Sequence, residues 1–143
     1  MDRAGLKDKK REMQKEKAPL RRLPDAELEI MKELWAAGEP LTRAALEQRL
    51  TRRQWSSTTL LALLARLEEK GYVAREKQGR GYLYTAVLTR EEYLPVESRS
   101  ALGRMFGGSA KNLVAAMAET NTLTDAEIDE LADFLEQLHR EGR

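Results

Sequence analysis

A tight hairpin bounded by two glycines, placed after three short helical segments, limits the fold of this chain more than any other feature of its sequence. Residues 72–77 and 82–86 each have the composition of a strand, and Gln78-Gly79-Arg80-Gly81 joins them. The two glycines permit the positive backbone angles of a hairpin turn and leave Arg80 at its exposed tip. The sequence therefore predicts one small β-hairpin in a chain that is otherwise mainly α.

Three segments before the hairpin have apolar residues at spacings of three and four, which is typical of helices. The first follows Pro24 and ends at Gly38. Its apolar face is expected to consist of Leu28, Met31, Leu34 and Trp35. Thr42 is suited to cap a short second helix. That helix carries Ala45, Leu46 and Leu50.

The third segment begins at Ser56 or Ser57 and runs to Lys70, and Gly71 suits the left-handed position that ends a helix. Its buried stripe is expected to consist of Leu60, Leu63, Leu64 and Leu67. The opposite face carries Thr58, Thr59, Ala62 and Arg66. Short polar side chains let a helix approach base edges, and an arginine can fork onto guanine or hold a phosphate. An ordinary solvated face would look the same if this helix stood alone.

The hairpin favours the interpretation of this face as one that reads DNA. Three short helices followed by a basic hairpin describe a winged helix-turn-helix, whose third helix enters the major groove of DNA while the hairpin touches the flanking backbone. Residues expected to fix the register on phosphates are Arg43, Ser56, Ser57 and Arg80. Residues expected to read bases are Thr58, Thr59 and Arg66.

After Thr89 the apolar residues return at helical spacing, with a break at Gly107-Gly108-Ser109 and a capping box formed by Thr124 and Glu127. Helices of this length would hardly enclose a core of their own, so we expect them to pack against a second copy of the chain. The alternative is that they fold back onto the winged helix. The residues expected at the dimer interface are Leu102, Phe106, Leu113, Met117, Ile128, Leu131, Leu135 and Leu138.

Three regions follow from these patterns. Residues 1–22 alternate basic and acidic side chains with few apolar ones, and we expect a mobile basic tail. The tail is either a phosphate-contacting arm or an extension without a role in binding, and we favour the latter. Residues 23–88 are predicted to form the winged helix-turn-helix DNA-binding domain, and residues 89–143 the helical dimerisation domain.

The charge of the chain is segregated, although its net value is only +1. Residues 41–90 carry ten Lys/Arg and four Asp/Glu, whereas residues 91–143 carry five and eleven. Such a division suits a protein that meets phosphates with one region and a second subunit with another. The positive excess lies around the helix-turn-helix and the hairpin, at Arg43, Arg52, Arg53, Arg66, Lys70, Arg75, Lys77 and Arg80.

That excess also bears on the main alternative function, a winged-helix protein-docking module without specific DNA binding. A docking surface would show exposed aromatic or aliphatic anchors in this region. The basic residues favour duplex DNA as the partner instead.

Other classes of function find little support. The chain has no cysteine, which excludes disulfides, thiolate metal sites and cysteine nucleophiles. Its one histidine, His139, lies at the end of the last predicted helix without a nucleophile or metal partner nearby in sequence. We therefore expect no enzyme activity, no metal and no cofactor. The apolar stretches are too short to span a bilayer and the amino terminus has no signal-peptide core, so we expect a cytoplasmic protein.

Four stretches of the sequence stand out together: residues 25–35 (DAELEIMKELW), residues 55–60 (WSSTTL), residues 66–71 (RLEEKG), and Gly79-Arg80 followed by residues 82–85. In combination they resemble the penicillinase repressor family of bacterial regulators, the BlaI and MecI type, over residues 23–141. The resemblance implies a homodimer that blocks transcription from a palindromic operator. It also implies that Ser56, Thr58 and Thr59 lie near the start of the recognition helix, that Arg80 lies on the wing, and that the helices after Thr89 dimerise.

The sequence departs from the family at three places. Antibiotic-responsive members act with a membrane-bound sensor protease that triggers cleavage at an Asn-Phe bond, and the matching bond here is Ala116–Met117. Copper-responsive relatives carry a cysteine pair near the end, which this chain lacks. Leu61 and Ala62 stand where antibiotic-responsive members tend to carry polar residues, so their operator sequence does not carry over to this chain.

Overall fold

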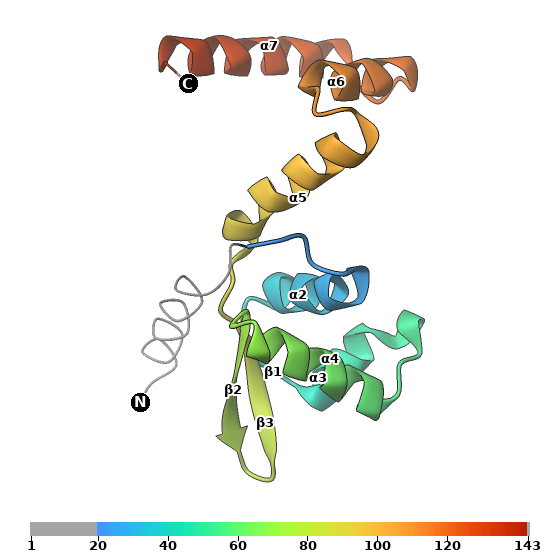
Figure 1. Ribbon diagram of the computed structural model, residues 1–143, viewed down its shortest axis with the longest axis vertical. Helices are drawn as coiled ribbons and strands as arrows, with labels where there is room; N and C mark the ends of the chain where they lie inside the picture. Colours follow the sequence, from blue (N-terminus) through green and yellow to red (C-terminus); the bar gives the residue numbers. More distant parts are fainter. Residues whose placement is uncertain (1–19, 143) are drawn as a thin grey trace. The chain divides into compact units, whose positions relative to one another are not determined.

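The computed structural model describes residues 20–142, which fold into two compact units that divide between Glu97 and Ser98 (Figure 1). Most of the predicted basic tail, residues 1–19, lies outside the described residues. Leu20 already packs against the core of the first unit. Each unit is described by itself below.

The first unit contains three α-helices in the predicted order. They are α2 (Asp25–Ala37), α3 (Arg43–Arg49) and α4 (Ser57–Glu69), with a short 3₁₀ turn, η1 (Thr51–Arg53), between α3 and α4. Gly38 ends α2 in the left-handed conformation, with a φ of 67°, and its N–H donates to the carbonyl of Leu34. Thr42 caps α3 as expected, because its hydroxyl accepts from the N–H of Ala45 at 3.1 Å.

The buried face of α2 differs from the predicted one. Ile30 is fully buried beside Met31 and Leu34, whereas Leu28 and Trp35 are only half-buried. The prediction placed the apolar face too far toward Leu28 and Trp35. The first buried position of α2 holds an acidic residue, Glu27, which a search for apolar residues does not count.

A three-stranded antiparallel sheet completes the unit, in the order β1-β3-β2. The predicted hairpin consists of β2 (Val73–Gln78) and β3 (Gly81–Ala86). The additional strand β1 (Leu41–Thr42) pairs with β3, with Leu41 opposite Tyr84. β1 was not predicted, because two residues cannot show the alternating pattern of a strand.

The hairpin turn consists of two residues, Gly79 and Arg80, since Gln78 pairs with Gly81. Gly79 has a φ of 60°, while Arg80 and Gly81 have negative φ. A positive φ at the first central residue alone is the pattern of a type II′ turn, which suits a two-residue hairpin. Only one of the two glycines therefore supplies the positive angle that the sequence suggested for both.

The core of the first unit is built around α4. All four leucines of its predicted stripe are buried. The apolar residues that are at least 98 % buried in this unit are Leu23, Ile30, Met31, Leu46, Leu60, Leu64, Leu67, Val73, Val87 and Tyr93. The opposite face of α4 is therefore free for another role.

Two aromatic residues join the end of α2 to the start of the next helix, α5 (Arg90–Met105). The Tyr93 hydroxyl accepts from the backbone N–H of Leu23 at 2.8 Å, and Trp35 Nε1 donates to the carbonyl of Leu88 at 2.8 Å. The two rings lie 6.0 Å apart. Burial raises the pKa of the Tyr93 hydroxyl. The sequence analysis passed over Tyr93, which anchors residues 20–23 to this cluster.

The second unit contains the rest of α5, then α6 (Ala110–Glu119) and α7 (Asp125–Arg140). Ser109 caps α6, and the predicted capping box of Thr124 and Glu127 is present at the start of α7. His139 lies in the last turn of α7, as expected. Neither α6 nor α7 has a fully buried residue.

A nearly buried ion pair holds the first turn of α2 to the last residues of α4. Glu27 is only 2 % exposed, and its Oε1 lies 2.6 Å from Lys70 Nζ. The Lys70 side chain is 40 % exposed, so water reaches one side of the pair. A buried carboxylate is costly without a partner, which makes Lys70 a structural residue.

We expect Lys70→Met to lower the free energy of unfolding by about 2 kcal/mol, between the ~0.5 of an exposed pair and the ~4 of a broken buried pair. The measurement is urea unfolding followed by tryptophan fluorescence. Lys32→Met is the matched control, because Lys32 is exposed on α2. Equal stability of the two variants would contradict a structural role for Lys70.

Candidate nucleic-acid interface

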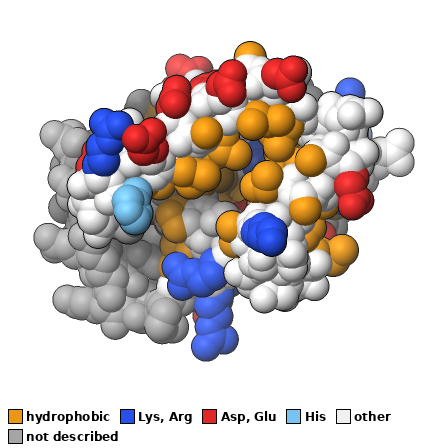
Figure 2. All heavy atoms as spheres, turned by 90° about the horizontal axis from the view of Figure 1, so that it is seen from above, with side chains coloured by type: hydrophobic (Ala, Val, Ile, Leu, Met, Phe, Trp, Pro, Cys, Tyr) orange, Lys and Arg blue, Asp and Glu red, His pale blue; other side chains and the backbone are white. Residues whose placement is uncertain are grey.

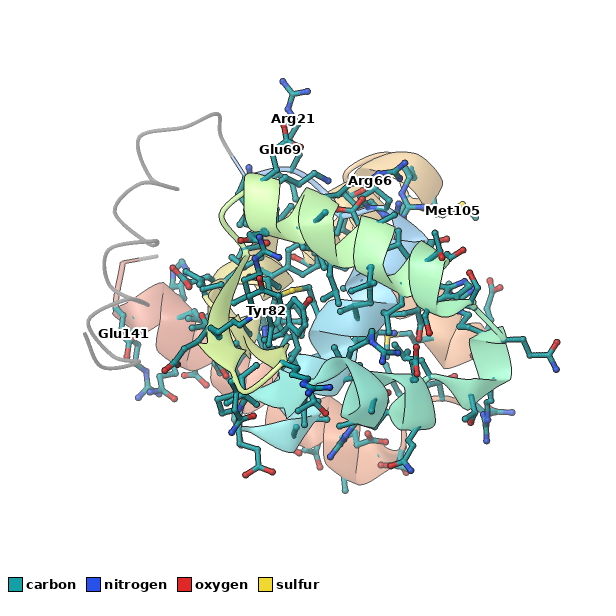
Figure 3. All side chains as sticks on the ribbon, turned by 90° about the horizontal axis from the view of Figure 1, so that it is seen from below. Arg21, Arg66, Glu69, Tyr82, Met105 and Glu141 are labelled. Carbon is teal, nitrogen blue, oxygen red and sulfur yellow. The ribbon has the colours of Figure 1, made fainter. Side chains whose placement is uncertain are left out.

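The exposed face of α4 carries the residues predicted to read bases. Ser56 caps the helix, since its hydroxyl accepts from the N–H of Thr59 at 3.1 Å and donates to the Thr59 hydroxyl. Thr58, Thr59 and Arg66 are all exposed. In Figure 3, Arg66 and Glu69 lie along the edge of α4 that is turned away from the hairpin carrying Tyr82. The helix thus presents short polar groups at its start and one long cation two turns later.

A three-residue network joins the start of α3 to the start of α4. Arg43 donates to Glu47 Oε1 at 2.7 Å and to the Ser57 hydroxyl at 3.0 Å, and Ser57 donates to the same carboxylate. The hydrogen bond from Ser57, followed by the contact with Arg43, holds the pKa of Glu47 below its ordinary value. Two of the predicted phosphate contacts, Arg43 and Ser57, are thereby fixed by a carboxylate that the sequence analysis did not consider. The Arg43–Glu47 spacing of four residues was the available signal.

The hairpin is tied to the end of α4 and carries stacked cations. Arg75 Nε lies 3.2 Å from Glu68 Oε1. The guanidinium of Arg75 and the ammonium of Lys77 lie 4.5 and 5.2 Å from the centre of the Tyr82 ring. Cation–π contacts of this kind hold long basic side chains in place. Arg80 is exposed at the turn.

The basic residues of this region differ in how far they are neutralised. Arg49 pairs with Glu33 at 3.5 Å, and Arg53 pairs with Glu29 at 3.4 Å, so both are matched by acidic residues of α2. Within residues 20–142, the basic residues of this region that form no ion pair are Arg52, Arg66, Lys77 and Arg80. The cations with the most available charge therefore lie in η1, on the exposed side of α4 and in the hairpin.

The structure brings some of the predicted site residues into direct contact and leaves others apart. Arg43 contacts Ser57, and Ser56 contacts Thr59, which gathers four residues at the start of α4. No hydrogen bond or ion pair between described residues joins Arg66 or Arg80 to this group. The resulting surface can bind an extended polyanion, whereas it offers no paired acid and base for catalysis. No cluster of three or more potential metal-binding side chains occurs in the described part of the chain.

Comparison with known proteins identifies the family. The model of the penicillinase repressor family matches residues 23–137. The chain belongs to the penicillinase repressor family. This confirms the resemblance of its sequence motifs, and because the members are repressors, it also confirms that the chain is not an enzyme.

Two relatives agree with this assignment in sequence, and one solved structure is given after them for comparison. The penicillinase repressor of Bacillus licheniformis is 33 % identical over 115 residues, which cover 80 % of this chain and 90 % of that protein. The methicillin resistance regulatory protein MecI of Staphylococcus aureus is 25 % identical over 113 residues, covering 79 % of this chain and 92 % of that protein. The solution structure of the DNA-binding domain of the repressor BlaI, 29 % identical, covers 55 % of this chain and 95 % of that domain, with a TM-score of 0.47.

Every helix of this penicillinase repressor homologue, in the part of the chain that the structure describes, falls short of the length and apolar character needed to cross a bilayer.

The network at the start of α4 leads to a prediction about Glu47. In Ser57→Ala the carboxylate loses the hydroxyl that donates to it, so we expect the pKa of Glu47 to rise toward its ordinary value. Carbon-13 NMR titration of the side-chain carboxyls measures this directly. Thr58→Ala, which removes the neighbouring hydroxyl, should leave the Glu47 titration unchanged; the same shift in both variants would argue against the network.

Proposed function

We propose that this repressor acts as a homodimer that binds a palindromic operator through the winged helix-turn-helix of residues 23–88 and dimerises through residues 89–143. The observation that carries the proposal is the division of α4. Its leucines are buried, while Thr58, Thr59 and Arg66 are exposed, and the hairpin that follows α4 carries at its tip Arg80, which forms no ion pair within residues 20–142. A recognition helix needs this division, because one side must hold it in the fold while the other enters the groove.

The proposed roles divide the site into two groups. Arg43, Ser56, Ser57 and Arg80 contact phosphates and fix the register of the protein on the duplex. Thr58, Thr59 and Arg66 read base edges in the major groove. The contacts with Glu47 support this division, since they hold Arg43 and Ser57 at the start of α4, where a phosphate can approach helix N–H groups.

The apolar surface of the second unit supports dimerisation. None of the eight residues expected at the interface is fully buried, and Phe134 and Leu135 of α7 are 54 and 55 % exposed. Figure 2 shows hydrophobic side chains gathered on one face of this helical region, with acidic side chains along its edge. Exposed apolar area of this kind is typical of a protein interface. A second copy, covering it, would hold two α4 helices one DNA turn apart, about 34 Å.

We also propose that a partner acts upstream of this repressor to release it from DNA. The family resemblance implies a membrane-bound sensor protease as this partner, and the bond that the resemblance matches to a cleavage site, Ala116–Met117, lies within α6. A protease binds extended backbone, so cutting at this bond would require α6 to unwind first. The proposed role in binding DNA also implies a cytoplasmic location.

Replacement of Arg80 and of Thr59 should separate the two kinds of contact. Arg80→Ala should weaken binding to all duplexes about equally and reduce the salt dependence of the affinity by about one counterion per subunit. Thr59→Val should instead change which sequence is preferred in a selection from random duplexes. The reverse pattern would overturn the assigned roles, and an affinity of the unmodified protein that does not depend on salt would favour a protein-docking module.

A charge in the apolar stripe of α7 should separate the subunits. We expect Leu135→Glu to be monomeric in sedimentation equilibrium and to bind an operator at least tenfold more weakly, because only one half-site is then held. Gln137→Glu adds the same charge at an exposed polar position of the same helix and should remain dimeric. A dimeric Leu135→Glu protein with normal affinity would contradict the proposed interface.

A further inference from the structure

One large apolar residue, Leu61, lies on the exposed face of α4 and has no role in the core. Its side chain is 43 % exposed, although the core side of the helix is already complete with four buried leucines. Within the described part of the first unit, Leu94 of α5 is the other large hydrophobic residue with comparable exposure, 42 %. A single exposed leucine is common on protein surfaces, so the exposure of Leu61 matters here because of its position, on the face of α4 that the proposed function turns toward DNA.

The position of Leu61 follows from its neighbours one and two turns along α4. A helix turns by about 100° per residue, so Leu61 shares a stripe with Ser57, four residues before it, and with Glu68, seven residues after it. Ser57 contacts Arg43 at the start of α3, and Glu68 pairs with Arg75 of β2. Leu61 therefore lies on the edge of α4 that is turned toward α3 and the hairpin, opposite the edge that carries Arg66.

The surroundings of Leu61 are open enough for a base to approach. Thr58, Ala62 and Ala65 are exposed beside it, and their side chains are short. The two carboxylates nearest this stripe are each paired with an arginine, Glu47 with Arg43 and Glu68 with Arg75. A protein partner would normally need several large apolar anchors, whereas Leu61 is the single one on this face.

We propose that Leu61 is a specificity-determining residue that recognises a thymine in each half-site by packing against its C5-methyl group. This inference rests on the proposed function, because it takes α4 as the helix in the major groove. The C5-methyl of thymine is the apolar group that B-DNA presents there, and contact with apolar side chains distinguishes thymine from cytosine. Leu61 thereby adds an apolar contact to the polar readout assigned to Thr58, Thr59 and Arg66.

The test uses uracil, which pairs as thymine does but lacks the methyl group. Duplexes selected by the unmodified, full-length protein are remade with each thymine replaced singly by uracil, and affinities are measured for the unmodified protein, for Leu61→Ala and for Leu94→Ala. We expect one uracil per half-site to weaken binding of the unmodified protein about fourfold, the effect of losing one buried methyl, and about 15-fold when both half-sites are changed. In Leu61→Ala this loss should disappear.

Leu94→Ala is the matched control, because it makes the same change at an equally exposed leucine on α5. It should keep the full uracil effect. The inference is overturned if no uracil matters, if the loss is the same in Leu61→Ala, or if the selected half-sites contain no thymine; in each of these cases specific DNA binding, and with it the proposed function, still stands. Absence of any sequence preference in the selection would instead overturn both.

Discussion

The burial of one side of α4 is the constraint on which the rest of the molecule depends. Four leucines at helical spacing are withdrawn from water together, and each contributes about 2 kcal/mol of apolar burial that no other orientation of the helix would recover. The rotation of α4 about its axis is thereby fixed. Thr58, Leu61 and Arg66 face outward as a direct consequence, and the surface that we propose binds DNA is the side that the core does not use.

Both ends of α4 are held by polar contacts to other elements. At its start, Arg43 and Glu47 of α3 bind Ser57, and at its end Lys70 pairs with the buried Glu27 of α2. The hairpin is fastened to the same end through Glu68 and Arg75. Packing fixes the rotation of the helix, and these contacts fix its position along its axis. In the proposed function, that position decides where the exposed residues of α4 meet the groove. We expect these contacts to favour this one arrangement, because breaking any of them would leave a polar group without its partner.

The second unit differs from the first in that its apolar stripes remain exposed. Its helices have strong caps and clear apolar stripes, yet α6 and α7 bury no residue completely. Capping and helix propensity explain why the helices form, whereas they do not explain why leucine and phenylalanine should remain in contact with water. The free energy available from covering these side chains is the physical basis for expecting association between subunits.

Local patterns were enough to predict much of this protein. The leucine stripe of α4, the Thr124–Glu127 capping box, the stop at Gly38 and the turn at Gly79-Arg80 each depend on residues within a few positions of one another, so they could be recognised without a fold. Other features arise only when distant segments meet. β1 exists because Leu41 pairs with Tyr84, Tyr93 is buried by accepting a hydrogen bond from Leu23, 70 residues earlier, and Glu27 is tolerated in the core because Lys70 reaches it. These contacts have no signature in the neighbouring sequence, since their free energy comes from partners that the folded chain alone brings together.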